Sequence, residues 1–338
     1  QKSPQPKKKY INNMNYRNII IITICAYLYA GPAFEVTTIK GKTALVTGGS
    51  QGLGLAIAKD LAKEGVSKLA ICARNIEKVN KAKEALAIEF PNVKVYGFRC
   101  DISDKSSRNL LVKELFSAFN NKLDILINNA GVEKCYHYEK YTEEDIEMQM
   151  QINNNGAAQL TRAFMPQMIE RKTGHIVMMS SILGQIPCAY CAIYSATRHF
   201  TYGLAMSLRG EMAHRQTGVT VHSIHPGFIE NTGVYKNVQD DVKKDTSAQE
   251  FHIHWLFGTG GQDVDTAIAV SKMIKTNQPE VIINTPPLRP TIVLSKIFPR
   301  FFDYLVYYWP GTVDPLADAI KLRVNGKLKR DTLAVSSV

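Results

Sequence analysis

The stretch that decides the fold is Thr47-Gly48-Gly49-Ser50-Gln51-Gly52-Leu53-Gly54, between a β-branched run at residues 43–47 and a helical pattern at residues 55–64. Glycines at positions 48, 52 and 54 let the backbone turn tightly and approach a ligand. The N-terminus of the following helix offers unpaired N–H groups to a pyrophosphate. A glycine-rich turn alone is weak evidence, but its place between a strand and a helix indicates a phosphate-binding loop.

Short β-branched runs alternate with longer helical patterns outward from this loop. Such alternation predicts a parallel sheet covered on both faces. We therefore expect a Rossmann-like, doubly wound α/β domain of about seven strands at residues 40–285, with extensions at residues 1–39 and 286–338. The predicted strands are residues 43–47, 68–72, 94–98, 125–128, 175–179, 219–224 and 281–283, and long helices are expected at residues 142–169 and 194–214.

The composition is that of a folded protein. The chain has 338 residues, of which 45% are hydrophobic and 21% charged. These values exclude a disordered tail protein, a collagen-like repeat and a polytopic membrane protein. The net charge of +11 comes mostly from the two ends, since residues 1–40 carry six basic and one acidic side chain, and residues 286–338 carry eight and four. A nearly neutral middle argues against a nucleic-acid partner and favours membrane-surface contact by the ends.

The end of the second predicted strand bears on the choice of dinucleotide. Arg74 stands twenty residues beyond Gly54. An acid there would bind a ribose 2′-hydroxyl, whereas Arg74 can pair with a 2′-phosphate. We therefore expect NADP(H) rather than NAD(H), with a solvated surface arginine as the alternative. After the third strand, Asp101 is expected either to accept a hydrogen bond from adenine or to cap the next helix.

Three further motifs follow in order along the chain. Asn128-Asn129-Ala130-Gly131 comes after the fourth strand, Ser180-Ser181 after the fifth, and Tyr194-Ser195-Ala196-Thr197-Arg198 lies on the next helix. Together with the glycine-rich turn, they resemble the motifs of the short-chain dehydrogenase/reductase family over roughly residues 40–285.

The resemblance implies a catalytic set of Ser181, Tyr194, Asn153 and the cation at position 198. Ser181 lies thirteen residues before Tyr194, and Asn153 is selected from Asn153-Asn154-Asn155 by its place three residues before Gly156. The residues that the resemblance places against the cofactor are Thr47, Gly48, Ser50, Gln51, Gly52, Leu53, Gly54, Arg74, Asp101, Ile102, Asn129, Ala130, Gly131, Tyr194, Arg198, Pro226, Gly227, Ile229 and Thr232.

Two positions depart from the family pattern. The family's lysine, four residues after the tyrosine, is Arg198 here. Its permanent charge is expected to favour tyrosinate, but it cannot readily lose a proton and its planar fork is bulkier than an ammonium group. The turn His225-Pro226-Gly227-Phe228-Ile229 resembles the family's turn beneath the nicotinamide, yet the hydroxyl residue expected five after the proline is Asn231, and Thr232 comes one later. Either could reach the carboxamide.

The resemblance implies hydride transfer between a nicotinamide and a ketone or alcohol, with Tyr194 supplying the proton. Residues 228–261 are polar and then aromatic, which predicts a lid. With the aromatic stretch at residues 289–309, they favour a lipophilic substrate such as a steroid, a retinoid or a 3-oxo lipid. The alternative is a cofactor-binding protein whose catalysis is impaired by Arg198. A homodimer or homotetramer is also implied.

The ends and the cysteines suggest a location. The apolar run at residues 19–30 is too short to span a bilayer, and we expect a shallow membrane anchor, with a signal segment and a packed helix as the alternatives. Six cysteines without framework spacing favour a reducing compartment, at an endoplasmic reticulum or cytoplasmic face, or else a soluble cytoplasmic protein. No metal site is expected, because Cys188 and Cys191 lack a second ligand pair and suit ordinary apolar packing.

Overall fold

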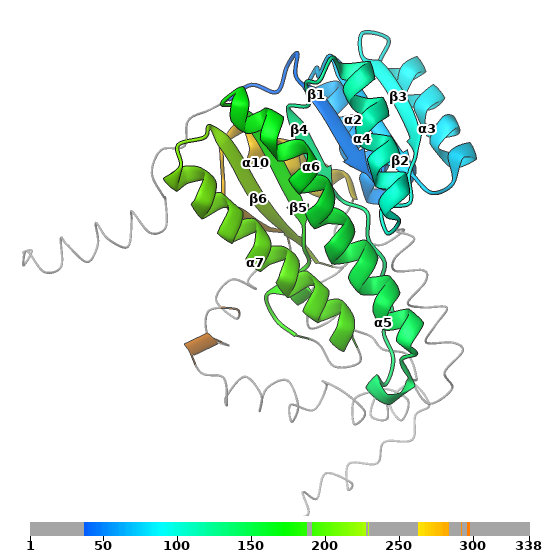
Figure 1. The fold of residues 1–338 in the computed structure, drawn as a ribbon, viewed down its shortest axis with the longest axis vertical. Helices are drawn as coiled ribbons and strands as arrows, with labels where there is room; N and C mark the ends of the chain where they lie inside the picture. Colours follow the sequence, from blue (N-terminus) through cyan, green and yellow to red (C-terminus); the bar gives the residue numbers. More distant parts are fainter. Residues whose placement is uncertain are drawn as a thin grey trace, which may run out of the picture. The chain divides into compact units, whose positions relative to one another are not determined.

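The computed structural model describes residues 37–187, 191–227, 229, 263–283, 292 and 296–297. Their strands form one parallel sheet in the order β3-β2-β1-β4-β5-β6-β7 (Figure 1). The strands are β1 Thr43–Thr47, β2 Lys68–Ala73, β3 Lys94–Arg99, β4 Ile125–Asn128, β5 Gly174–Met179, β6 Val219–Pro226 and β7 Glu280–Ile283. The doubly wound α/β prediction is confirmed, and each predicted strand differs by at most two residues at either end.

Helices cover both faces of the sheet, because alternate strand residues are apolar on each face. In β1, Ala44 and Val46 pack into one core cluster with α2, α3 and α10, while Leu45 packs into the other with α4, α6 and α7. Figure 1 shows α4, α6 and α7 side by side over this second face. The helices are α2 Gly52–Lys63, α3 Ile76–Glu89, α4 Lys105–Phe119, α5 Glu143–Met150, α6 Ala157–Glu170, α7 Ala192–His214 and α10 Asp263–Lys275, with short turns η1 Tyr138–Lys140 and η3 Ile182–Gly184.

The long helix predicted at residues 142–169 is not one regular helix. Between α5 and α6 the chain forms a π-helical segment, η2, at Gln151–Gly156. Wider π turns often mark functional sites within helices. The segment contains the run Asn153-Asn154-Asn155, and the first two of these side chains are buried.

The amino-terminal edge of the sheet is held by a buried carboxylate. Asp124, just before β4, accepts a hydrogen bond from the Thr43 N–H (2.9 Å) and one from Arg171 Nη1 (2.7 Å). Burial alone would raise the pKa of Asp124, but Arg171 and the Thr43 N–H outweigh it and hold that pKa below its usual value. This network joins β1, β4 and the end of α6 at the edge opposite the glycine-rich loop.

Several predictions concern segments outside the described residues. They are the anchor at residues 19–30, most of the N-terminal extension at residues 1–39, most of the lid at residues 228–261, the position Thr232, and most of the aromatic stretch at residues 289–309. Within the part of the chain that is described, no helix combines the length and apolar character needed to cross a bilayer.

Candidate active site

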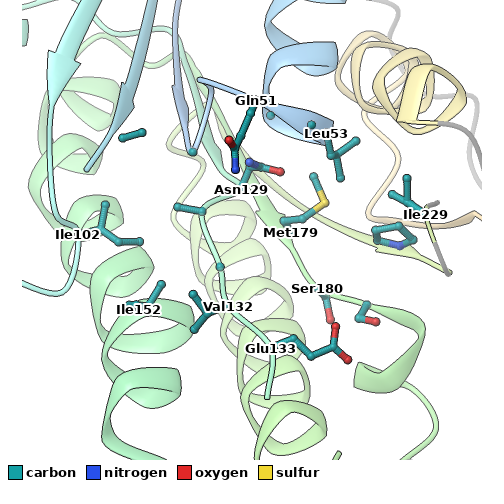
Figure 2. Close-up of a pocket in the computed structure, with 18 of the residues that line it drawn as sticks. Gln51, Leu53, Ile102, Asn129, Val132, Glu133, Ile152, Met179, Ser180 and Ile229 are labelled. Carbon is teal, nitrogen blue, oxygen red and sulfur yellow. The ribbon is translucent and has the colours of Figure 1, made fainter. Parts of the chain in front are cut away.

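A pocket lies at the carboxyl ends of the strands, where the order reverses between β1 and β4. This switch point is where open parallel sheets bind their ligands. The cavity measures about 360 Å³. Figure 2 shows side chains from the glycine-rich loop, the strand ends and η2 converging on it. Of the predicted site residues, those lining it are Gly48, Ser50, Gln51, Gly52, Leu53, Gly54, Arg74, Asp101, Ile102, Asn129, Ala130, Gly131, Ser181, Tyr194, Arg198, Pro226, Gly227 and Ile229.

The glycine-rich loop is shaped for close approach to a phosphate group. Gly48 has a φ of +67°, which favours glycine, and its N–H donates to the Cys72 carbonyl at 2.8 Å. A Cβ at Gly54 would overlap the Gly48 carbonyl. Gln51 precedes α2 without a side-chain cap, and the first turn carries no acid. The N–H groups and positive end of the helix dipole are therefore available to a pyrophosphate, and the loop fits a dinucleotide.

Thr47 lies behind the pocket and fastens two strand ends together. Its Oγ1 accepts hydrogen bonds from the Asn129 N–H and the Ala130 N–H, each at 3.0 Å. In return, Asn129 Nδ2 donates to the Thr47 carbonyl at 2.9 Å. The contact predicted for Thr47 is thus indirect in this structure, since it orders the loop that follows β4.

The predicted 2′-phosphate position lies beside two cations. Arg74 is exposed, lines the pocket, and has no hydrogen bond or ion pair within the described residues. On the first turn of α3, Lys78 Nζ donates to Gln51 Oε1 at 2.9 Å. Gln51 also lines the pocket, so the Lys78 charge lies close to this end of it.

Asp101 does not cap α4. The cap is Asp104, whose side chain accepts from the Ser107 N–H at 2.6 Å. One Asp101 oxygen, Oδ1, accepts from the N–H and hydroxyl of Ser103, and the side chain lines the pocket. Of the two sequence alternatives, the cap is therefore wrong, and contact with adenine remains a prediction.

Among the three consecutive asparagines, Asn153 is the one joined to the loop after β4. Its Oδ1 accepts from the Val132 N–H, and its Nδ2 donates to the Val132 carbonyl, both at 2.8 Å. The same Nδ2 lies 3.1 Å from Thr197 Oγ1 on α7. Asn154 instead donates to the Thr197 carbonyl, and Asn155 to Gln151. Asn153 thus connects η2, the pocket loop and the helix that carries Tyr194.

Arg198 is buried within the pocket wall. The residue is 5% exposed, and its Nη1 donates to the Met179 carbonyl at 2.9 Å. Its Nε has no hydrogen-bond partner among the described residues. The guanidinium carbon lies 4.7 Å from the centre of the Tyr194 ring. The expected cation therefore stands beside the phenol, with a buried N–H group that no described residue pairs.

Tyr194 is more basic than the sequence suggested. Burial raises its pKa and outweighs the charge of Arg198 and the hydrogen bonds from Arg198 and Ser181, which act in the opposite direction. The neighbouring Ser180 is directed elsewhere, since its hydroxyl donates to the Arg198 backbone carbonyl at 2.9 Å. Ser181, rather than Ser180, therefore accompanies the phenol, as its spacing from Tyr194 predicted.

The turn after β6 borders the same end of the pocket. His225 Nδ1 donates to the Ser181 carbonyl at 3.0 Å, which ties the end of β6 to the residue that follows β5 and Ser180. Burial lowers the pKa of His225 to about 4. Pro226, Gly227 and Ile229 line the pocket, while Asn231 and Thr232 lie outside the described residues.

Sequence reasoning missed an acidic residue in the pocket. Glu133, two residues beyond Gly131, lines the cavity, and Figure 2 shows its carboxyl group directed toward Ser180. Burial raises its pKa to about 7, although Arg198 opposes this. The motif Asn128-Asn129-Ala130-Gly131 stops short of this position, so its proximity to α7 becomes apparent only in three dimensions.

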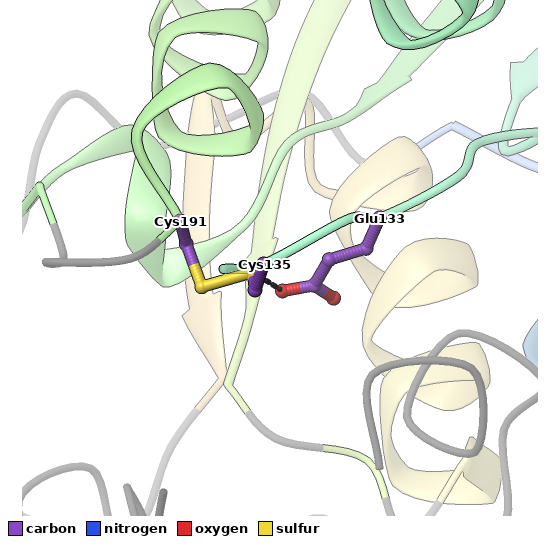
Figure 3. A group of neighbouring side chains, drawn as sticks. All are labelled: Glu133, Cys135 and Cys191. Carbon is purple, nitrogen blue, oxygen red and sulfur yellow. Dashed lines mark hydrogen bonds between the residues drawn. A yellow bond between two sulfur atoms is a disulfide. The ribbon is translucent and has the colours of Figure 1, made fainter. Parts of the chain in front are cut away.

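A disulfide lies next to Glu133. Cys135 is bonded to Cys191, the residue that precedes α7, and Cys135 Sγ lies 3.3 Å from Glu133 Oε1 (Figure 3). The prediction of ordinary apolar packing is therefore wrong for Cys191. Its partner is 56 residues away and not Cys188, which lies outside the described residues. These two sulfurs and the Glu133 carboxylate form a cluster, but the sulfurs are bonded to each other.

Comparison with known proteins places the chain among its relatives. It matches the short chain dehydrogenase family over residues 42–243. It is 30% identical to Ketoacyl reductase HetN of Nostoc sp. over 284 residues, which cover 82% of this chain and 92% of HetN. It is also 30% identical to 3-oxoacyl-(acyl-carrier-protein) reductase FabG of Staphylococcus aureus over 230 residues, 68% of this chain and 89% of FabG.

Solved structures agree in fold. A short-chain dehydrogenase from Sphingobium yanoikuyae in complex with NADPH superposes with a TM-score of 0.63 at 21% identity, covering 88% of this chain and 100% of that chain. A metagenomic short-chain oxidoreductase in complex with NADP gives a TM-score of 0.59 at 26% identity, covering 74% and 100%. By its sequence match, its sheet order and its pocket, this chain belongs to the short-chain dehydrogenase family and is an NAD(P)-dependent oxidoreductase.

Proposed function

We propose that the protein is an NADP(H)-dependent reductase of a lipophilic carbonyl compound, of the 3-oxoacyl type. The observation that carries the proposal is the juxtaposition of Ser181, Tyr194 and Arg198 at one end of a pocket whose other end holds the glycine-rich loop. Two relatives are named for reduction of ketoacyl or 3-oxoacyl groups. Steroids and retinoids are the other lipophilic carbonyl compounds compatible with this site.

The preference for NADP(H) is supported by charge. Arg74 reaches the pocket at the end of β2, and Lys78 lies close by through its bond to Gln51. Arg74 stands at the position where an acid would repel a 2′-phosphate, and a second cation close by suits such a phosphate. Arg74→Glu is expected to raise the Kd for NADPH more than tenfold and to change that for NADH little, and titration by cofactor fluorescence measures both.

The chain's own residues perform the proton transfer and hold the substrate. A bound nicotinamide cofactor supplies the hydride. Ser181 and Tyr194 hydrogen-bond the carbonyl oxygen and stabilise its developing negative charge, and the Tyr194 hydroxyl gives that oxygen its proton. The Arg198 charge stabilises the tyrosinate that results. Arg198 and Asn129 both line the pocket, where the ribose of a bound nicotinamide nucleotide would lie.

An apolar wall supports a lipophilic substrate. At the end of the pocket that holds Ser181, the apolar lining residues are Val132, Ile182 and Leu183. Ile229, which follows the Pro226-Gly227 turn, is another. Such a wall excludes water and offers few hydrogen bonds to a polar substrate.

Association through the α5–α7 surface is proposed as well. Phe200 on α7 and Met150 at the end of α5 expose 46% and 44% of their surface, and a partner subunit packed on these helices would cover them. A homodimer or homotetramer would bury both. We also propose that the basic ends contact a membrane surface, on the charge distribution given above.

The test compares the native chain with Tyr194→Phe. Oxidation of NADPH is followed by absorbance with 3-oxoacyl thioesters of increasing chain length. The native protein is expected to turn over, with kcat/KM rising with acyl length, and Tyr194→Phe to lose about 100-fold or more while still binding NADPH. Binding without turnover by the native protein on every carbonyl tried would support the impaired alternative, and unchanged turnover in Tyr194→Phe would refute the catalytic assignment.

A further inference from the structure

Four charged side chains line the pocket among the described residues, two at each end. Arg74 and Asp101 stand at the ends of β2 and β3, where the adenosine half of a dinucleotide is expected. Glu133 and Arg198 stand at the opposite end, beside Tyr194. The first pair has a role in the resemblance, whereas Glu133 has none.

Arg198 needs a counter-charge, because a buried permanent cation is costly unless it is paired. The hydrogen bond from its Nη1 goes to the Met179 carbonyl, and its Nε has no partner among the described residues. No described carboxylate forms a salt bridge with it. The acid whose pKa responds to its charge is Glu133, across the pocket corner.

The loop that carries Glu133 is held in place on both sides. Before it, Val132 is fixed by two hydrogen bonds with Asn153. After it, Cys135 is bonded to Cys191 at the start of α7. The carboxylate is thereby kept near the helix that carries Tyr194 and Arg198, as Figure 3 shows for the disulfide side.

The two charges act on the phenol in opposite directions. Arg198 lowers the pKa of Tyr194, and Glu133 raises it. Arginine stays charged at every accessible pH, so a site with Arg198 alone has a constant field. Glu133 has a pKa raised to about 7 and so changes its charge under physiological conditions.

We propose that Glu133 is a positioning residue of the active site, which offsets the charge of Arg198 at Tyr194 when ionised and leaves it unopposed when protonated. The family pattern has a single lysine at this place, which can lose its proton. Here the Arg198 guanidinium supplies the positive charge, and the Glu133 carboxyl group supplies the titration. The proposal rests on Tyr194 being the proton donor of the proposed reaction. Its physical content is that Tyr194 becomes a stronger acid as the pH falls through the range in which Glu133 takes up a proton.

Other titratable and charged groups lie around Glu133. The bonded sulfurs of Cys135 and Cys191 do not titrate. His225 faces the site from β6, but with a pKa of about 4 it stays neutral near pH 7. Lys134 follows Glu133 in the loop, and His199 lies on α7 beyond Arg198, with its Nδ1 2.9 Å from the Ser195 carbonyl. The Glu133→Gln variant separates the effect of Glu133 from that of these groups.

The test observes Tyr194 directly. Tyrosines are labelled with carbon-13 at Cζ, the Tyr194 resonance is assigned from its absence in Tyr194→Phe, and the full chain is titrated without cofactor or substrate. We expect a step in this resonance near pH 7 in the native protein. The step disappears in Glu133→Gln, persists at a changed midpoint in Glu133→Asp, and persists unchanged in Glu139→Gln, which removes an exposed carboxylate six residues further along the chain. A native protein without the step, or Glu133→Gln that retains it, would overturn the proposal.

Kinetics distinguish this proposal from the proposed function. In alcohol oxidation, which needs tyrosinate, Glu133→Gln is expected to shift the acidic limb of kcat/KM to lower pH by about one unit, a tenfold gain at a fixed pH on that limb. If the resonance step is present and no carbonyl or alcohol substrate is turned over, the proposed function fails and the charge coupling stands. If turnover is present and the step is absent, only the coupling fails. The native titration does not depend on Glu133→Gln, and Glu133→Asp tests the same carboxyl group, so a misfolded Glu133→Gln does not obscure the result.

Discussion

The effect of Arg198 on turnover decides between the active enzyme and the impaired alternative. The Arg198 charge lies close to Tyr194, and its Nη1 is anchored to β5. We expect Arg198→Met to lower kcat about 100-fold, because the tyrosinate loses its cation. We expect the free energy of unfolding to change by less than the activation free energy. Arg198→Lys is the matched control: turnover similar to the native protein supports an adapted arginine, and a large gain would show that the native site is impaired.

Gly131 provides a steric test of the same site. A Cβ there would overlap the Arg198 guanidinium and lie 3.2 Å from Asn153 Oδ1. We expect Gly131→Ala to displace Arg198 and to reduce turnover at least tenfold, measured by NADPH oxidation. Gly203 on α7 has nothing within 4 Å of the same position. Gly203→Ala should leave turnover unchanged and stabilise the helix by about 1 kcal/mol. Equal effects of Gly131→Ala and Gly203→Ala on turnover would contradict the steric role of Gly131.

For single residues, the sequence predicts contacts between neighbours on one helix. It does not predict contacts between segments that folding brings together. The spacing of Tyr194 and Arg198 on one helix predicts their contact, which the structure shows. Glu133 and Cys135 are not part of a spacing pattern, and their proximity to α7 depends on the path of the loop after β4. The choice of Asn153 among three asparagines follows from the family pattern, and the structure supplies the hydrogen bonds that distinguish it.

The disulfide joins two elements, the loop after β4 and the start of α7. It closes a loop of 56 residues, for which the chain-entropy model gives about 4 kcal/mol of stability. We expect Cys135→Ser to lower the free energy of unfolding by up to about this amount, measured by urea titration followed by circular dichroism. A dithiol reductant should do the same to the native protein and nothing to the variant. Native stability that ignores the reductant would contradict the cross-link.

The π segment shows what sequence reasoning cannot resolve within an element. The helical pattern over residues 142–169 predicts an uninterrupted helix, because apolar spacing is nearly the same for one wide turn as for regular turns. The structure instead has η2 between α5 and α6, with Asn153 and Asn154 both directed to Thr197.

Strand positions were predictable since continuous β-branched runs between helices leave few alternatives.

The whole molecule should lose stability in mild acid. Burial lowers the pKa of His175 to about 4 and that of His222 to about 3, and His225 behaves similarly. The unfolded chain takes up these protons near pH 6.5 and the folded chain does not, so the contribution of the histidines to stability is full above that pH and falls below it. Glu133 offsets part of this loss, because its raised pKa favours the folded chain as the pH falls. Each histidine contributes about 1.4 kcal/mol per pH unit until its folded pKa is reached.

Urea titrations at several pH values check this. His222 Nδ1 donates to the Gln278 carbonyl and its Nε2 lies 2.8 Å from Thr220 Oγ1, and burial disfavours an added proton on Nε2. We expect the slope of stability against pH between about 6.5 and 4 to become shallower in His222→Gln than in the native protein. Asp124 adds to the acid effect only at lower pH, since its pKa lies below the usual carboxyl range. A flat native profile down to about pH 4 would refute the assignment.

For the molecule as a whole, the doubly wound sheet and the phosphate-binding end of the pocket were predictable, because a glycine-rich turn after the first strand of an alternating pattern marks the dinucleotide site. Substrate and membrane contact were not, since they depend on the lid and the two ends, for which patterns of charge and aromaticity permit several arrangements.

The opposite edges of the sheet have a practical consequence. The pocket occupies the carboxyl ends of the strands, and the Thr43, Asp124 and Arg171 network fastens the amino ends. The Asp124 network therefore shares no residue with the pocket, although the Cys135–Cys191 cross-link adds stability at the pocket end. An engineer who seeks a new substrate can change pocket residues away from that cross-link and leave the fastening of the amino ends intact.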